Sequence, residues 1–346
     1  MRRIGMLAAG LLVVVAAGHG VAWWLIGSAV VASIDRPGPD GERVHHAGLA
    51  RGGWPLRAGV TIARPELHRP ATGILPAITL SAVSAEAGVQ LAAPRDPTVT
   101  FRCPCRVTFP GVPGAAPADI EAGALVLSFR LETDAPPRRW QLDGEDITVA
   151  QAADSVQLAS LRLIAERDEA ASGPRQTVAF TLGGVRLGPA AEAPFGRVIR
   201  SATGEVVVSG ALPVGPDTEA ALRAWRAEDG RIELRRLAIA WGPLALSAGA
   251  TLALDAALQP TGIGTIRVAN WRPALEAVGN AGMIDRQALA LVRLALAALA
   301  RPAPGGGSMV ELPVALEQRT LTAARIPIAR LPEIAWPRGP YTLGSN

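Results

Sequence analysis

Apolar and polar positions divide the chain into one long apolar run at its start and a series of short alternating segments after it. The run extends from Ile4 to Val31 and is interrupted only by His19, Ser28 and several glycines. About 20 apolar residues are enough for a helix to cross the hydrocarbon core of a bilayer. Because lipid offers the backbone no hydrogen-bond partners, such a run must be helical. The pattern predicts an N-terminal signal-anchor transmembrane helix over residues 1–34.

The residues at the two ends of this run indicate its orientation. Arg2 and Arg3 precede it, and Trp23 and Trp24 lie late in it, where aromatic side chains meet the membrane interface. Under the positive-inside rule the arginines stay in the cytoplasm and residues 35–346 are exported. In a bacterium, the chain is then a single-pass inner-membrane protein with its C-terminal domain in the periplasm. The membrane is the first predicted partner.

A cleaved signal peptide is the alternative to a permanent anchor. It needs a shorter apolar core and a small-residue cleavage site. Val31 interrupts the best-placed triplet of small residues, so we favour the uncleaved anchor. His19 inside the run has no carboxylate beside it, and we interpret it as a neutral, structural residue.

Beyond a turn-rich linker over residues 35–50, the pattern is that of a β-rich exported domain over residues 51–346. Apolar residues alternate with polar ones, which is typical of an antiparallel sheet with one solvated side. The clearest predicted strands cover residues 124–132, 140–149, 155–166 and 176–187. The apolar positions change parity across Arg235 and Arg236, which predicts a β-bulge. We expect a mainly β (α+β) fold, an extended, antiparallel, twisted sheet with a few packed helices.

Helical periodicity replaces the alternation at three places. The predicted helices cover residues 217–229, 273–278 and 285–300. Asp217 and Asp285 are suitable N-caps for the first and last of them. The last helix is mostly Ala and Leu with Arg293 as its only internal charge, and it is too short to span a membrane. We therefore expect a core helix there.

The composition argues against one class of partner. All 34 basic residues are Arg, the net charge is only +4, and the pI is about 10.2. A nucleic-acid-binding protein concentrates its basic residues in a patch with interleaved aromatics. Here the arginines are scattered between apolar positions, so we expect no nucleic-acid partner.

The two cysteines, Cys103 and Cys105, form a Cys-Pro-Cys sequence. An oxidising periplasm permits a disulfide, but a bridge across one residue is geometrically demanding. A strained or intermolecular disulfide and a free thiol pair therefore both remain open. Two thiolates alone do not complete a zinc site, and the Cys-x-x-Cys spacing of redox proteins is absent.

Two groups of polar residues are candidates for chemistry. His45, His46 and His68 are a loose metal-binding candidate, but without the usual ligand spacing we interpret them as surface residues. Asp143, Glu145 and Asp146 are candidates for acid–base work or calcium, although Asp-Gly-Glu-Asp is first of all a turn sequence. The chain has no nucleophile elbow and no phosphate-binding loop. We expect no enzyme, no catalytic residue, no metal and no cofactor.

Several short motifs, strongest in the last third, resemble a family of bacterial membrane-anchored proteins catalogued as domain of unknown function 2125. They are Gly53–Arg57, Gly230–Leu234, Ile239–Leu244, Leu252–Asp255, Gln259–Gly262 and Pro327–Pro332. The resemblance implies an envelope location and a single repetitive β-rich domain, and it carries over no activity.

Two functional hypotheses follow. The first is a binding module whose concave apolar sheet face holds a lipid or another hydrophobic envelope component. The alternative is a structural or assembly factor that docks partner proteins at the envelope without a ligand. A hydrolase at the acidic run is a weaker third hypothesis.

Overall fold

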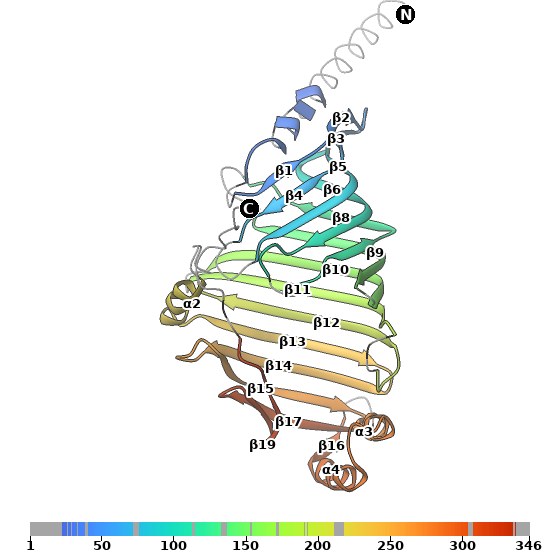
Figure 1. Ribbon diagram of the computed structural model, residues 1–346, viewed down its shortest axis with the longest axis vertical. Helices are drawn as coiled ribbons and strands as arrows, with labels where there is room; N and C mark the ends of the chain where they lie inside the picture. The colour runs from blue at the N-terminus through green and yellow to red at the C-terminus, as the bar shows by residue number, and fades with distance from the viewer. Residues whose placement is uncertain are drawn as a thin grey trace, which may run out of the picture.

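The strands of this protein form one continuous antiparallel sheet in the computed structural model (Figure 1). The structure describes residues 23–336 except 26, 29, 33, 39–40, 72–75, 113–114, 133–136, 153, 171–172, 190, 192, 211–217, 304–306 and 335. The first strands are β1 (Arg43–His45), β2 (Gly48–Gly52), β3 (Arg57–Ala63), β4 (Glu66–Arg69), β5 (Ile78–Gln90), β6 (Ala93–Thr108), β7 (Ala118–Glu121), β8 (Ala124–Phe129) and β9 (Arg139–Gln151). The others are β10 (Asp154–Ala170), β11 (Gly173–Arg186), β12 (Val198–Ser209), β13 (Arg231–Trp241), β14 (Leu244–Leu254), β15 (Pro260–Ala269), β16 (Ala300–Pro302), β17 (Ser308–Glu317), β18 (Thr320–Ala323) and β19 (Ile326–Arg330).

The strand order follows the sequence closely. From β9 to β15 each strand pairs with the next, and β15 then pairs with β17. At three positions in the sheet, two short strands pair with different parts of the same long strand. Strands β3 and β4 both pair with β5, and β7 and β8 both lie between β6 and β9. Strands β16 and β18 both pair with β17. Figure 1 shows β2 and β19 at opposite ends of the molecule. The expected mainly β, antiparallel fold is confirmed.

A line of irregularities, called the crease below, crosses the sheet from β5 to β12. On β9 and β11 it is marked by positive φ angles, at Asp146 (50°) and Gly184 (58°). The register places Ala159 of β10 between these two residues. On β6 and β12 the crease is marked by shifts in register, opposite Val83 and next to Arg200.

The crease changes the parity of the apolar positions without changing the face on which they lie. In β10, Val156 and Leu158 on one side of it and Leu161 and Leu163 on the other are half-buried, whereas Gln157 and Arg162 are exposed. Because a slip of one residue moves every side chain to the other face, an irregular residue is needed at each parity change. The predicted bulge at Arg235 and Arg236 obeys the same rule and is confirmed by a register shift.

After the N-terminal region, the described part of the chain has three helices, which lie at the margins of the sheet: α2 (Thr218–Ala227), α3 (Trp271–Asn280) and α4 (Arg286–Leu299). They correspond to the predicted helices, with α3 longer than expected. Asp285 caps α4 by accepting hydrogen bonds from the backbone N–H groups of Gln287 and Ala288. The predicted N-cap of α2, Asp217, lies outside the described residues.

The expectation that residues 285–300 form a core helix is wrong. No residue of α4 is buried, and Leu291 and Leu294 are 69% and 72% exposed. A stripe formed by Leu289, Val292 and Leu296 packs against the buried cluster of α3 and β17. A mostly apolar composition does not reveal how many sides of a helix pack against other elements.

The N-terminal region is described only from Trp23 onward. Within the described residues no helix is both long enough and apolar enough to cross a membrane. The predicted anchor residues Arg2 and Arg3, as well as His19, lie outside the described part. Strand β1 and the first residues of β2 fall within the segment 35–50 that was expected to be a linker.

Candidate ligand-binding face

One face of the sheet carries two unbroken rows of apolar residues, in which each residue lies directly opposite the next across the strands. The first row is Val60, Ala87, Val99, Leu127, Leu142, Leu163, Phe180, Gly204, Leu237, Ala248, Ile266 and Leu312. The second is Ile62, Ala85, Phe101, Leu125, Gly144, Leu161, Leu182, Ala202, Ile239, Leu246, Val268 and Val310. We call the two rows together the apolar track. At about 4.8 Å between strands, it extends roughly 50 Å along the sheet.

The residues between these rows point to the opposite face and are mostly polar. That intervening row is Thr61, Glu86, Thr100, Val126, Asp143, Arg162, Thr181, Thr203, Ala238, Ser247, Arg267 and Glu311. The alternation that predicted the strands is therefore kept in phase from β3 to β17. Along these rows the sheet has one apolar face and one mostly polar face.

The two ends of the apolar track pack against other elements, and most of the residues between them are half-buried, although Leu125 and Ala202 are buried. At the N-terminal end Val30, Val31 and Ile34 pack against the buried residues Val60 and Ile62. At the other end Trp271 and Leu275 of α3 pack against Val310, with Leu312 beside them. Between these clusters no residue of β13, β14 or β15 is fully buried.

This partial exposure defines what the track can bind. When a ligand covers apolar side chains that are in contact with water, the free energy of binding becomes more favourable by about 25 cal/mol for each Å² covered, or about 0.8 kcal/mol for each CH₂ group buried. The two rows present aliphatic groups, and the cross-strand ladder satisfies the backbone polar groups beside them. The surface therefore suits hydrocarbon and offers it no charged partner along the rows.

The polar face is crossed by ion pairs between neighbouring strands. Arg106 and Asp119 approach to 2.6 Å, Arg236 and Glu205 to 2.9 Å, and Arg267 and Glu311 to 3.0 Å. Hydrogen bonds from these arginines hold the pKa of Asp119, Glu205 and Glu311 below their ordinary values. Exposed pairs of this kind are screened by solvent and contribute little to stability. A hollow of about 320 Å³ on this face is lined mainly by small side chains, including those of Ser201, Ala238 and Ser247.

The comparison with protein families identifies the chain. A family model described as "Uncharacterized protein conserved in bacteria (DUF2125)" matches residues 21–332. The chain belongs to the DUF2125 family. No curated protein and no solved structure matches it.

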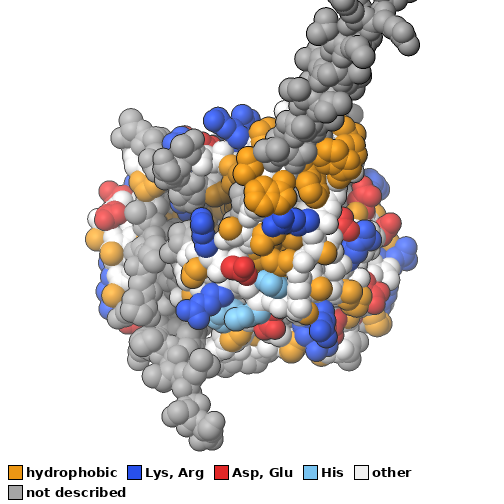
Figure 2. All heavy atoms as spheres, turned by 90° about the horizontal axis from the view of Figure 1, so that it is seen from above, with side chains coloured by type: hydrophobic (Ala, Val, Ile, Leu, Met, Phe, Trp, Pro, Cys, Tyr) orange, Lys and Arg blue, Asp and Glu red, His pale blue; other side chains and the backbone are white. Residues whose placement is uncertain are grey.

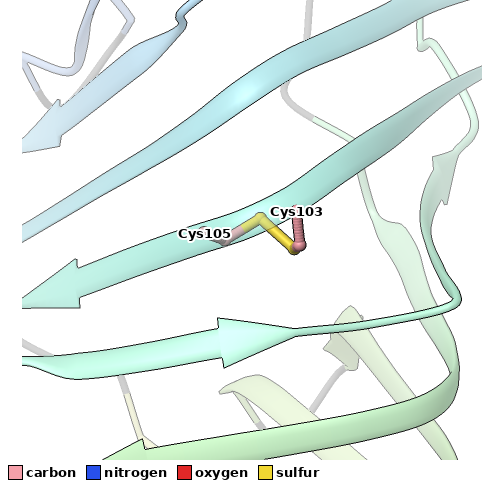
Figure 3. Close-up of a disulfide and its surroundings, with 2 residues drawn as sticks. All are labelled: Cys103 and Cys105. Carbon is pink, nitrogen blue, oxygen red and sulfur yellow. A yellow bond between two sulfur atoms is a disulfide. The ribbon is translucent and has the colours of Figure 1, made fainter.

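In this DUF2125 protein Cys103 and Cys105 are joined by a disulfide (Figure 3). Their Cα atoms are 4.5 Å apart, whereas residues i and i+2 of a regular strand are separated by about 6.6 Å. The bridge lies where the crease crosses β6, opposite Val83. The intramolecular disulfide is thus part of the irregular backbone of the crease.

The acidic residues Asp143, Glu145 and Asp146 lie within β9, and the expectation of a turn there is wrong. The irregularity at Asp146 belongs to the crease, which interrupts the alternation without reversing the chain. Asp143 accepts hydrogen bonds of 2.6 Å from Arg162 and Gln141. Burial raises the pKa of Asp143, but these hydrogen bonds and the charge of Arg162 outweigh it, so the pKa lies below its ordinary value. A carboxylate held ionised by Arg162 serves the sheet as a cross-strand pair.

The three histidines have separate partners. His46 Nε2 lies 3.1 Å from Asp35, and His68 Nδ1 lies 3.2 Å from the hydroxyl of Thr79. His45 stands opposite Glu66 in the β1–β4 ladder. In the described part of the chain no three potential ligands gather around a metal position.

Proposed function

We propose that this DUF2125 protein is anchored in the bacterial inner membrane and binds a lipid or another hydrophobic envelope component in the periplasm. The observation that supports this function best is the apolar track, continuous from β3 to β17 and part-exposed between its covered ends. Its length is suited to extended hydrocarbon chains, which need contact area and no specific polar contacts.

We also propose that the protein is not an enzyme. The acidic residues that made a hydrolase conceivable belong to the polar face, away from the track. Among them, Asp143 forms an ion pair with Arg162, and this pair links β9 to β10. The ligand in this proposal is carried without being altered.

A matched pair of variants tests the function. Leu246 belongs to the track, and Ser247 belongs to the polar row and stands opposite Arg267. Full-length protein is purified from membranes, and its bound lipid is quantified by mass spectrometry. Leu246→Glu should lower the affinity for lipid roughly tenfold or more, because a buried Leu contributes about 1.5–3 kcal/mol. Ser247→Glu should retain the wild-type amount.

Two results would contradict lipid binding. One is a wild-type protein that carries no lipid after purification in a mild detergent. The other is equal lipid content in Leu246→Glu and Ser247→Glu proteins with the same circular dichroism spectrum.

One observation favours the alternative, an assembly factor without a ligand. The outer side of α4 exposes Leu291 and Leu294 to solvent, and exposed apolar patches are typical of protein interaction sites. A photo-crosslinking residue at position 294 should then join the chain to a specific protein in cells, while the purified protein is free of lipid. A cross-linked partner together with bound lipid would favour the binding module.

A further inference from the structure

A cluster of large apolar side chains lies at the N-terminal end of the sheet and remains exposed. Trp24, Leu25, Trp54 and Leu56 are 53%, 55%, 54% and 78% exposed. With Trp23 we call them the tryptophan patch. Figure 2, which views the molecule from this end, shows hydrophobic side chains gathered there.

Specific contacts hold the patch together. The rings of Trp23 and Trp54 meet edge to face with centroids 5.8 Å apart, and Trp23 Nε1 donates a 2.8 Å hydrogen bond to the carbonyl oxygen of Arg57. The backbone N–H of Arg57 donates to the carbonyl oxygen of Gly53, which closes the turn that carries Trp54 and Leu56. A turn closed by a hydrogen bond thus presents the exposed aromatic and aliphatic side chains.

Arginines border the patch, and no acidic side chain lies within residues 43–65. The Arg51 guanidinium lies 5.7 Å from the ring centre of Trp24. Arg57 donates a 2.7 Å hydrogen bond to Thr98 from the same turn. Tryptophan at the level of the headgroups, with arginine beside it, is the combination found at membrane interfaces.

We propose that the tryptophan patch rests in the interface of a phospholipid bilayer, with Leu56 and Trp54 inserted beside the N-terminal segment. The position of the patch selects this occupant, since Trp23 and Trp24 belong to the long apolar run Ile4 to Val31. Any bilayer that holds this run lies next to the turn at 53–56. The sheet then contacts the membrane at two places, the N-terminal segment and the turn at 53–56. Two contacts fix the orientation of the sheet relative to the membrane, whereas a single tether does not.

This orientation places the N-terminal end of the apolar track at the membrane. Val60 and Ile62, the first residues of the two rows, lie on β3, which begins directly after the patch. The inference depends on the predicted anchor and does not depend on lipid being bound along the track.

An environment-sensitive fluorophore tests the proposal. Cys103 and Cys105 are joined, so a maleimide reagent labels only an added cysteine. Full-length Leu56→Cys protein carrying the fluorophore NBD is reconstituted into liposomes of phosphatidylcholine and phosphatidylglycerol. The matched control is Ala297→Cys, exposed on α4 at the other end of the sheet. We expect blue-shifted emission that brominated lipids quench at position 56, and water-like, unquenched emission at position 297.

The proposal fails if the label at position 56 reports water, or if the labelled chain does not float with the liposomes. It also fails if the emission shifts only as protein density rises and brominated lipids do not quench it, since the patch would then contact a second copy. Lipid carried on the track changes none of these readings, so this result is independent of the Leu246→Glu experiment.

Discussion

Gly204 shows how one position shapes the apolar track. It stands directly opposite Phe180, and a Cβ built on Gly204 would lie 2.3 Å from the Phe180 ring. The ring therefore lies over the backbone of β12. Gly249, by contrast, has only ordinary contacts, with its nearest neighbour at 3.4 Å.

This difference gives a prediction at the residue scale. Gly204→Ala should destabilise the protein by about 1–3 kcal/mol, because the added methyl displaces the Phe180 ring from its place in the row. Gly249→Ala should change stability by less than about 1 kcal/mol, with the sign favouring the alanine. Urea unfolding followed by circular dichroism measures both. Equal losses in the two variants would mean that Phe180 does not pack on Gly204.

The ion pairs of the polar face predict a pH dependence. Glu205 has its folded pKa below the ordinary value of 4.5 because Arg236 and Arg235 donate to it. A lowered folded pKa stabilises the protein above the unfolded value, and this contribution is lost as the pH falls through the folded pKa. The melting temperature should fall below about pH 4.5, and less so in Glu205→Gln. An identical acid profile for the variant would contradict the role given to this pair.

At the scale of elements, α3 and α4 differ in how far they belong to the core. Leu275 of α3 is buried against Trp271 and Val310, whereas Leu294 of α4 faces solvent. Only three leucine and valine side chains of α4 contact the cluster. The helix is attached along one stripe.

The two helices should therefore respond differently to substitution. Leu275→Ala should cost about 2–5 kcal/mol, as for other buried leucines. Leu294→Ser should change stability by no more than about 0.5 kcal/mol, as at other exposed positions. Thermal unfolding of the two variants measures the difference. A large loss in Leu294→Ser would show that the outer side of α4 is covered in the native protein.

At the scale of the whole molecule, a single sheet with one apolar face poses a problem that other proteins solve with a second layer. Here the described covering elements pack at the two ends of the track, through Val30, Val31 and Ile34 and through α3 and α4. The middle of the face depends on contacts within the sheet. A long one-layer surface of this kind is suited to hold an extended apolar ligand.

Much of this architecture is legible in the sequence because alternation is a local property. The strands of the region 124–187, the helices and the bulge at Arg235 all follow from the period of the apolar residues, and Asp285 caps α4 as its side chain predicts. The prediction of a turn at residues 143–146 is wrong, although Asp-Gly does favour turns locally. The cross-strand ladders of β9 with β8 and β10 outweigh that preference.

The sequence by itself determined that this chain forms alternating strands with one apolar side each, since side-chain period depends only on neighbouring residues. Only the tertiary structure decided that these sides align from Val60 to Leu312 in unbroken rows, because register is set by pairing between strands. The same holds for the crease, for the exposure of α4 and for the meeting of Trp23 with Trp54, which are distant along the chain. Contacts between distant segments, and the surfaces that those contacts leave exposed, are properties of the folded molecule.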